Sequence, residues 1–116
     1  MELRFRESAV ADIGQFVASY VEGFFELYSD TGIWSEEIIL ESIRSNGKKL
    51  FYDLYAAVEM RLAPRRVLGR KKQKRGWQES RFYVGSRLVI VYYSEDRKAR
   101  IRRVESISID RKPIIF

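Results

Sequence analysis

Residues 77–109, WQESRFYVGSRLVIVYYSEDRKARIRRVESISI, decide the fold of this chain. Three β-prone runs separated by two short polar segments predict a three-stranded β-meander. The first run, 81–84, stops at Gly85-Ser86, where glycine allows the positive φ of a tight turn. The second run, 87–93, is apolar almost without a break, which is typical of a strand buried on both faces.

The third strand of this meander is predicted to be irregular. Residues 94–98 are polar and predict a turn, after which the chain returns as a strand over 99–109. The apolar residues of this last run do not alternate strictly, so we predict a β-bulge near Arg102-Arg103. A meander of this kind needs a helical layer over one face, and the N-terminal half of the chain is expected to supply it.

The N-terminal half predicts one short strand followed by helices. Alternating apolar and basic residues favour a strand over 1–7, and apolar residues at three- and four-residue spacing favour helices over 8–63. Ser8 and Ser35 are placed to cap two of these helices. Gly47 predicts a break, with a third helix after it. The expected fold class is α+β, a small mostly antiparallel sheet with two or three helices packed on one face.

Length and composition limit the possible chemistry. The 116 residues predict a single domain: a strand (1–7), a helical layer (8–63), a basic loop (64–76), a meander (77–110) and a tail (111–116). Without cysteine or histidine there is no disulfide, no thiolate and no Cys/His set for zinc, and no metal or other cofactor is expected. The charged start and the lack of a long apolar run predict a cytoplasmic protein with no membrane partner.

Charge is distributed unevenly along the chain. Residues 1–63 carry 6 Lys/Arg and 11 Asp/Glu, whereas residues 64–116 carry 16 Lys/Arg and 5 Asp/Glu. Such asymmetry indicates one cationic surface directed at a polyanion. The densest run allows three interpretations: a solvated charged loop, a contact with nucleic acid or the ribosome, or a nuclear-localisation signal. The candidate phosphate-binding residues are Arg65, Arg66, Arg70, Lys71, Lys72, Lys74, Arg75 and, in the tail, Lys112.

Two stretches resemble the RelE/ParE superfamily of bacterial and archaeal toxins. GSRLVIVYY (85–93) is similar to that family's glycine, any residue, arginine, then an apolar run ending in tyrosine. LRFRESAVADI (3–13) is similar to the usual start of its first strand and helix, and the order of elements agrees over the whole chain. The resemblance implies a type II toxin neutralised by a cognate antitoxin. Members of the RelE kind cut messenger RNA on the ribosome without a metal, and members of the ParE kind inhibit DNA gyrase.

The resemblance also implies a catalytic set. It places Arg87 at the scissile phosphate, Arg111 beyond the last strand with Lys112 beside it, and Arg81 on the preceding strand. Phe116 falls where the nucleases have a tyrosine, and the chain has no histidine to act as a base. Tyr83 or Tyr92 is a candidate phenol and Glu79 a candidate base.

Three functions therefore remain open from the sequence. The first is a RelE-like endoribonuclease that binds RNA or the ribosome through a basic sheet face, and the second is a ParE-like, non-enzymatic gyrase inhibitor. The third is a plain nucleic-acid-binding module, held by Lys/Arg contacts to phosphate. The competing interpretation of Arg81 and Arg87 is that they are ordinary surface cations of an antiparallel sheet.

Overall fold

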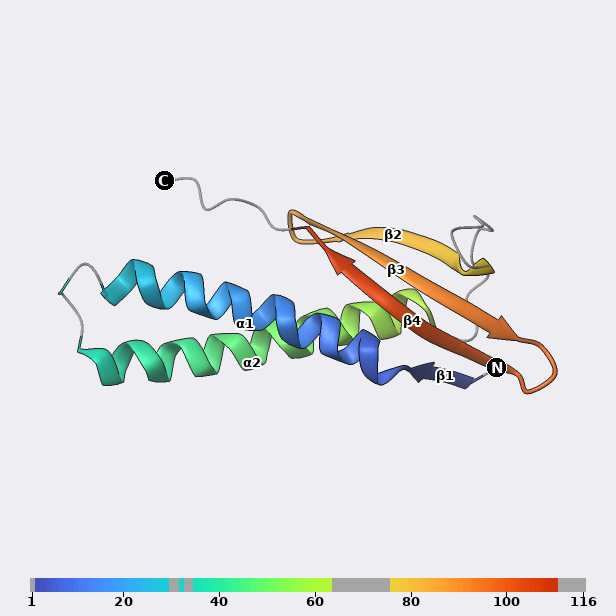
Figure 1. Cartoon of the computed structure of the whole chain (residues 1–116), viewed down its shortest axis with the longest axis horizontal. Helices are drawn as coiled ribbons and strands as arrows, with labels where there is room; N and C mark the ends of the chain where they lie inside the picture. Colours follow the sequence, from blue (N-terminus) through green and yellow to red (C-terminus); the bar gives the residue numbers. More distant parts are fainter. Residues whose placement is uncertain (1, 30–31, 33–34, 64–75, 111–116) are drawn as a thin grey trace.

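The computed structural model describes residues 2–29, 32, 35–63 and 76–110. Strand, two helices and three strands follow one another in the order β1, α1, α2, β2, β3, β4. The molecule is elongated, with a longest extent of 57 Å, because the helices form a hairpin that runs out beyond the sheet (Figure 1). The predicted α+β class, with helices on one face of a small sheet, is confirmed.

The four strands form one sheet in the order β1-β4-β3-β2. β1 (Glu2–Phe5) runs parallel to β4 (Ile101–Ile109), while β3 (Arg87–Asp96) is antiparallel to both β4 and β2 (Gln78–Val84). The predicted meander is therefore present, and Gly85 has a φ of 64° in the predicted turn. β3 continues three residues past its predicted end, because 94–96 still pair with β4.

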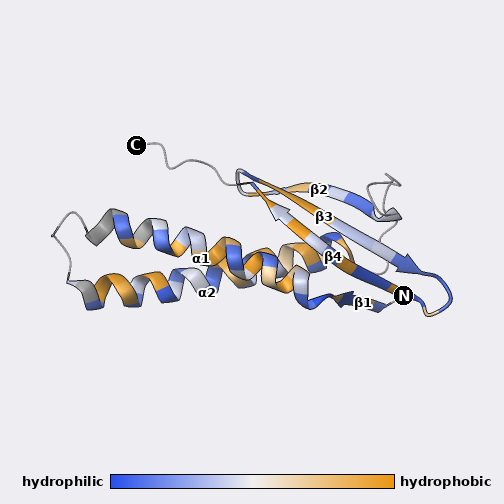
Figure 2. Cartoon of the chain, viewed as in Figure 1, coloured by the Kyte–Doolittle hydropathy of each residue, from blue (hydrophilic) through white to orange (hydrophobic). Residues whose placement is uncertain are grey.

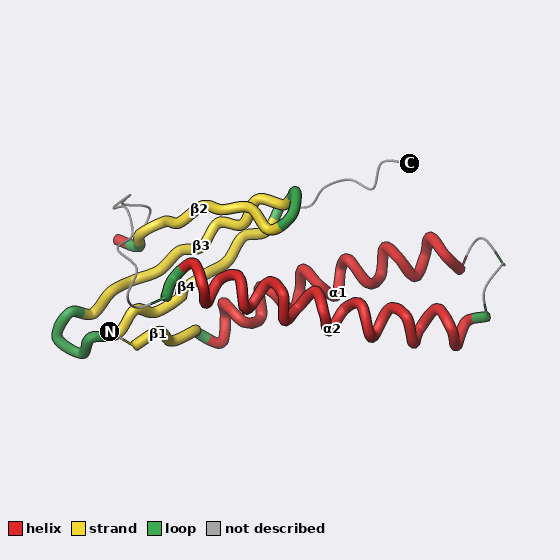
Figure 3. Tube along the Cα trace, turned by 180° about the vertical axis from the view of Figure 1, so that it is seen from behind, coloured by secondary structure: helices red, strands yellow, loops and turns green. Residues whose placement is uncertain are grey.

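The helices cover only one face of this sheet (Figure 3). Along β3, Val89, Val91 and Tyr93 are fully buried towards the helices, whereas the alternate residues Ile90 and Tyr92 are only partly buried. The prediction that this strand is buried on both faces is therefore wrong. We call the side that faces away from the helices the outer face; its residues include Arg4, Glu79, Arg81, Tyr83, Leu88, Ile90, Tyr92, Ser94 and Arg103.

The core lies between the inner face of the sheet and the part of the hairpin nearest to it. Apolar residues of both helices meet the buried residues of β3 and β4 there (Figure 2). Phe5 of β1 stacks on Tyr55 of α2 with ring centroids 4.5 Å apart, which ties the first strand to the helical layer. Among the described residues, no helix is long and apolar enough to span a membrane.

Two long helices, α1 (Glu7–Ser29) and α2 (Glu36–Arg61), make up the helical layer. Ser35 caps α2 as predicted, its side-chain oxygen accepting from the backbone N–H of Ile38 at 3.4 Å. The predicted break at Gly47 and the third helix after it are wrong, since α2 continues through this position.

Gly47 is buried where the two helices approach each other. A Cβ added to it would lie 3.1 Å from Cγ2 of Val21 and 3.7 Å from Cγ1 of Val17. The glycine therefore lets the two helices pack closely, and its presence marks a helix contact and not a helix end.

We expect Gly47→Leu to lower the free energy of unfolding by about 1–3 kcal/mol, because the added side chain overpacks the contact with Val21. Gly14→Leu is the matched control, since a Cβ on Gly14 would meet nothing within 4 Å. That control is expected to raise stability by up to ~1 kcal/mol through helix propensity. Urea unfolding of both variants checks this, and equal effects would contradict the packing argument.

β1 pairs only with residues 101–104 of β4, and the start of α1 covers the edge of β4 beyond them. The backbone N–H of Arg6 donates to the Val104 carbonyl at 3.0 Å, and the Asp12 carboxylate accepts from the backbone N–H of Ile107 at 2.9 Å. The predicted cap at Ser8 is wrong, because α1 begins at Glu7 and Ser8 lies inside the helix. Its Oγ instead donates to the carbonyl of Glu105 at 3.2 Å. These bonds satisfy backbone N–H and C=O groups at the edge of β4 that would otherwise be free to pair with another strand.

The predicted bulge in β4 exists, but it lies at Glu105 and not at Arg102-Arg103. Tyr92 pairs with Ser106 and Tyr93 pairs with Val104, which leaves Glu105 as the extra residue. Its position follows from burial: Val104 and Ile107 both face the helices although they are three residues apart. One additional residue between them is needed to keep both on the same face.

Tyr93 buries its hydroxyl with no hydrogen-bond partner among the described residues. Burial raises the pKa of Tyr93, the charge of Glu95 raises it further, and Arg102 lowers it. The folded chain therefore holds this phenolic proton more tightly than the unfolded chain, in which tyrosine ionises near pH 10.0. As the pH rises through that value the unfolded state loses its proton first, so stability falls.

Tyr93→Phe is expected to change the stability by less than about 1 kcal/mol at pH 7, since no hydrogen bond to a described residue is lost. Above pH 10 the free energy of unfolding of the variant should rise relative to that of the parent protein, because the variant has no phenol at this position to ionise on unfolding. Urea unfolding of both proteins at pH 7 and at pH 10.5 measures this difference. A stability difference between the two proteins that is the same at both pH values would contradict this prediction.

Candidate nucleic-acid interface

Strand pairing arranges the polar residues of the outer face in rows. Arg4 of β1 pairs with Arg103 of β4, which in turn pairs with Ser94 of β3. Nearer the β2–β3 turn, Tyr92 pairs with Glu79, and the next outer-face pair is Ile90 with Arg81. The register therefore places Tyr92 between the row of Arg103 and the row of Arg81.

Three arginines on or next to the outer face have carboxylate partners. Arg4 lies 3.1 Å from Glu2, Arg81 Nε lies 2.5 Å from Glu79, and Arg6, just after β1, is paired with Glu105. Arg103 has no ion-pair partner within the described part of the chain. Its guanidinium is thus the outer-face cation whose charge is not offset by a direct contact, which suits it to bind an anion from solution.

The two buried carboxylates hold their arginines in place. The side chains of Glu79 and Glu105 are 2% and 3% exposed, while those of their partners Arg81 and Arg6 are 57% and 54% exposed. Glu105 also accepts a hydrogen bond from Ser94 Oγ at 2.8 Å. The carboxylates therefore fix the stems of two arginines whose outer surfaces remain open to solvent.

Aromatic and apolar side chains lie among these cations. Tyr83 is 71% exposed, and Leu88, Ile90 and Tyr92 are partly exposed on the same face. Exposed rings beside guanidinium groups are the components of a surface on which unpaired bases stack while phosphates meet cations.

The two described members of the predicted catalytic set lie on opposite faces of the sheet. Val84 pairs with Arg87 and Arg81 pairs with Ile90. Because side chains alternate along a strand, those of Arg81 and Arg87 point to opposite faces of the sheet. The Arg87 guanidinium lies over the rings of two α1 residues, 4.8 Å from the centroid of Tyr20 and 5.3 Å from that of Phe16. Arg81 and Arg87 therefore do not form one cluster.

The other predicted site residues lie outside the described residues. These are Arg65, Arg66, Arg70, Lys71, Lys72, Lys74, Arg75, Arg111 and Lys112, together with Phe116. The last described residue before the tail is Asp110, whose N–H donates to the Leu88 carbonyl at 2.9 Å. The last described residue, Asp110, is thus bonded to the residue that follows Arg87.

The described residues on either side of the basic segment 64–75 lie at the same end of the sheet. Arg102, which is buried, donates from Nη1 to the carbonyls of Leu62 and Ala63 at 3.0 Å each. On the other side of the segment, β2 starts with Gln78 paired to Tyr93. The β3–β4 turn leaves this same end of the sheet, and it carries the exposed cations Arg97, Lys98 and Arg100.

The opposite end of the molecule is acidic. Glu22 and Glu26 of α1 and Glu37 and Glu41 of α2 are all exposed along the part of the hairpin that extends beyond the sheet (Figure 1). The charge asymmetry of the sequence thus becomes a separation of charge along the 57 Å axis. Such a separation orients a molecule as it approaches a polyanion.

Arg103 and Arg4 were not among the candidate site residues predicted from sequence. Their place on the outer face depends on the position of the bulge, because an irregularity at Arg102-Arg103 would have made their orientation indeterminate. The separation of Arg81 from Arg87, by contrast, follows from the two-residue turn at Gly85-Ser86, which fixes the register of the β2–β3 hairpin.

Comparison of the chain with protein-family models, curated proteins and solved structures gives no match. Over the ranges that the structure describes, no three acidic side chains gather as ligands for a metal ion.

Proposed function

We propose that this protein is the toxin of a type II toxin–antitoxin module, and that it acts on RNA through the outer face of its sheet. The observation that carries the proposal is Arg103, a cation without an ion-pair partner among the described residues, on a face that also presents Tyr83 and Tyr92. The order of elements supports the resemblance to RelE/ParE toxins, and a cognate antitoxin is the expected protein partner.

The outer face fits single-stranded RNA on the ribosome. A phosphate between the rows of Arg81 and Arg103 would meet guanidinium groups from two sides, and Tyr92 belongs to the row between them. Positioned cations of this kind stabilise the charge that develops when a 2′-hydroxyl attacks the adjacent phosphate. The first form of the proposal is therefore a metal-independent endoribonuclease, with Arg81 and Arg103 at the phosphate.

The second candidate is a non-enzymatic inhibitor of DNA gyrase. It is favoured by the separation of Arg81 from Arg87, which leaves the arginine cluster implied by the nuclease resemblance unassembled among the described residues. The absence of histidine from the sequence points in the same direction, since the usual base near neutral pH is missing.

Inducible expression in bacteria tests the toxin proposal. Growth arrest is expected, with relief on co-expression of the neighbouring open reading frame. Primer extension on cellular mRNA then separates the two candidates: discrete new 5′ ends support the endoribonuclease, and inhibited supercoiling by purified gyrase with intact mRNA supports the second candidate. Full growth with soluble, folded protein would contradict both.

A further inference from the structure

Two tyrosines stand apart from each other on the outer face of the sheet. Tyr83 of β2 pairs with Leu88 of β3, and Tyr92 lies four residues further along β3. A rise of about 3.4 Å per residue and a strand separation of about 4.8 Å put the two tyrosine Cα atoms about 14 Å apart. Tyr83 is 71% exposed and Tyr92 is partly exposed, so both rings can be reached from solvent.

Cations alternate with these two rings. Arg81 lies two residues from Tyr83 on β2, and it is a diagonal neighbour of Tyr92 across the β2–β3 pair. Arg103 is a diagonal neighbour of Tyr92 on the other side, across the β3–β4 pair. Diagonal neighbours on one face lie about 7–8 Å apart. The outer face therefore presents ring, cation, ring and cation in nearly even steps along one diagonal line.

The distance between the two rings does not fit a stacked RNA strand. A helical strand advances by about 3.4 Å per nucleotide, so neighbouring bases of such a strand cannot reach rings about 14 Å apart. More distant bases of a stacked strand have both faces covered by their own neighbours. A strand that occupies both rings must therefore be drawn out, with its bases separated from one another.

The residues between the two rings offer nothing that would distinguish one base from another by hydrogen bonds. Leu88 and Ile90 of β3 lie there, and both are apolar and only partly buried. Stacking on a tyrosine ring accepts any base, because every base has a π-face. The selectivity of this surface therefore depends on how readily a strand gives up its own stacking.

We propose that the outer face binds unstacked single-stranded RNA, with bases on Tyr83 and Tyr92 and phosphates at Arg81 and Arg103, and that it therefore prefers uridine-rich to adenine-rich strands. Uracil stacks weakly on its neighbours and adenine stacks strongly, and preferences of this origin are known for single-strand binding surfaces. The inference rests on the proposed function for the choice of RNA as the ligand.

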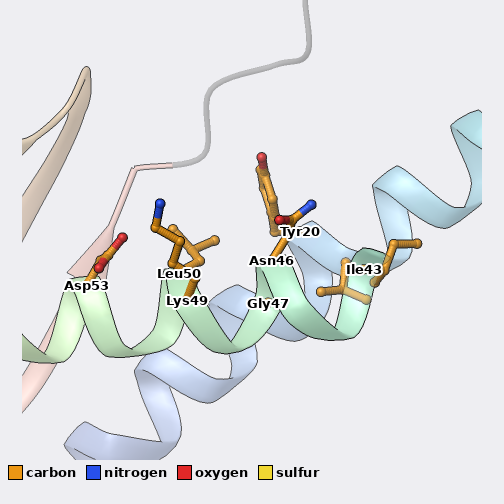
Figure 4. A pocket seen from close by; sticks show the side chains of 8 residues that line it. Tyr20, Ile43, Asn46, Gly47, Lys49, Leu50 and Asp53 are labelled. Atoms are coloured by element: carbon orange, nitrogen blue, oxygen red, sulfur yellow. The ribbon is translucent and has the colours of Figure 1, made fainter. Parts of the chain in front are cut away.

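The groove between the two helices is a poorer site for RNA. Its volume is about 240 Å³, and its lining includes Tyr20 from α1 and Lys49 and Asp53 from α2 (Figure 4). The single lysine of the lining is matched by the single aspartate, so the groove offers a polyanion no net positive charge. Binding is therefore expected on the sheet and not on the helical hairpin.

Fluorescence anisotropy with labelled oligouridine and oligoadenine of equal length tests the preference. The two strands carry the same number of phosphates, so contacts with cations contribute equally to both. Oligouridine is expected to bind the full chain about three- to tenfold more tightly than oligoadenine. Equal affinities, tighter binding of oligoadenine or no binding of oligouridine would each overturn the proposal.

Substitution of the two tyrosines tests the positions of the bases. Tyr83→Ala and Tyr92→Ala, each checked for folding by circular dichroism, should weaken oligouridine binding about five- to hundredfold. Tyr83→Phe keeps the ring and should bind like the parent protein. Tyr52→Ala is the matched control, because Tyr52 is 67% exposed on α2. Parent-like affinity in both outer-face alanine variants would overturn the proposal.

These measurements use purified protein and need neither cells nor ribosomes. A chain that prefers oligouridine but does not arrest growth would contradict the proposed function and leave this inference standing. A chain that arrests growth and cuts mRNA, but binds the two strands equally, would contradict the inference and leave the proposed function standing.

Discussion

Replacing Arg103 by glutamate is expected to weaken binding of an unstructured RNA oligonucleotide more than any other single change on the outer face. Arg103 is the cation there without an ion-pair partner among the described residues, so its whole charge is available to a phosphate. A hydrogen bond to a charged group contributes roughly 1.5–3 kcal/mol, which corresponds to about ten- to hundredfold in affinity. Charge reversal adds repulsion to this loss.

Fluorescence anisotropy over a range of salt concentrations measures the effect. With Arg103→Ala, the slope of log affinity against log salt should fall by about 0.7, the value for one phosphate contact on a single strand. Arg44→Glu is the matched control, because Arg44 is exposed on α2 within the acidic hairpin and its reversal changes the net charge equally. If both reversals weakened binding to the same extent, net charge and not the outer face would explain the affinity.

Arg102→Leu is expected to cost about 2–4 kcal/mol of unfolding free energy. Arg102 is 4% exposed, donates to the last carbonyls of the helical layer, and lies 3.4 Å from Glu95. Leucine would keep the apolar stem but leave the carbonyls of Leu62 and Ala63 and the Glu95 carboxylate without this donor. The same change would release the anchor at which the basic segment 64–75 begins.

Urea unfolding followed by circular dichroism checks this prediction, with Arg103→Leu as the control from the adjacent position. Arg103 faces away from the helices and should change stability by less than about 0.5 kcal/mol. Similar losses from both substitutions would show that Arg102 does not have the structural role assigned to it.

Several features set by local sequence were predicted correctly, although the predicted cap at Ser8 was wrong. The turn at Gly85 and the cap at Ser35 each depend on residues within a few positions, and the meander depends on three successive β-prone runs. Gly47 was misinterpreted because glycine has two uses in a helical segment. One use ends a helix, and the other allows a close helix contact, and only the position of Val21 distinguishes them.

Features that depend on register were harder to predict. The orientation of Arg103 and Arg102 changes with a one-residue shift of the bulge, and that shift depends on the burial of Val104 and Ile107 together. The opposite orientations of Arg81 and Arg87 could have been predicted from the length of the turn between their strands. Strand pairing therefore places on opposite faces two arginines that the family resemblance grouped together.

Chemical-shift mapping by NMR, with an unstructured RNA oligonucleotide titrated into the full chain, tests the central claim most directly. If the outer face binds RNA, the largest shifts will lie at Arg103, Tyr92 and Tyr83, with little change at the exposed hairpin residues Glu37 and Glu41. Shifts confined to α1 and α2, with the outer-face strands unchanged at saturating RNA, would contradict the claim.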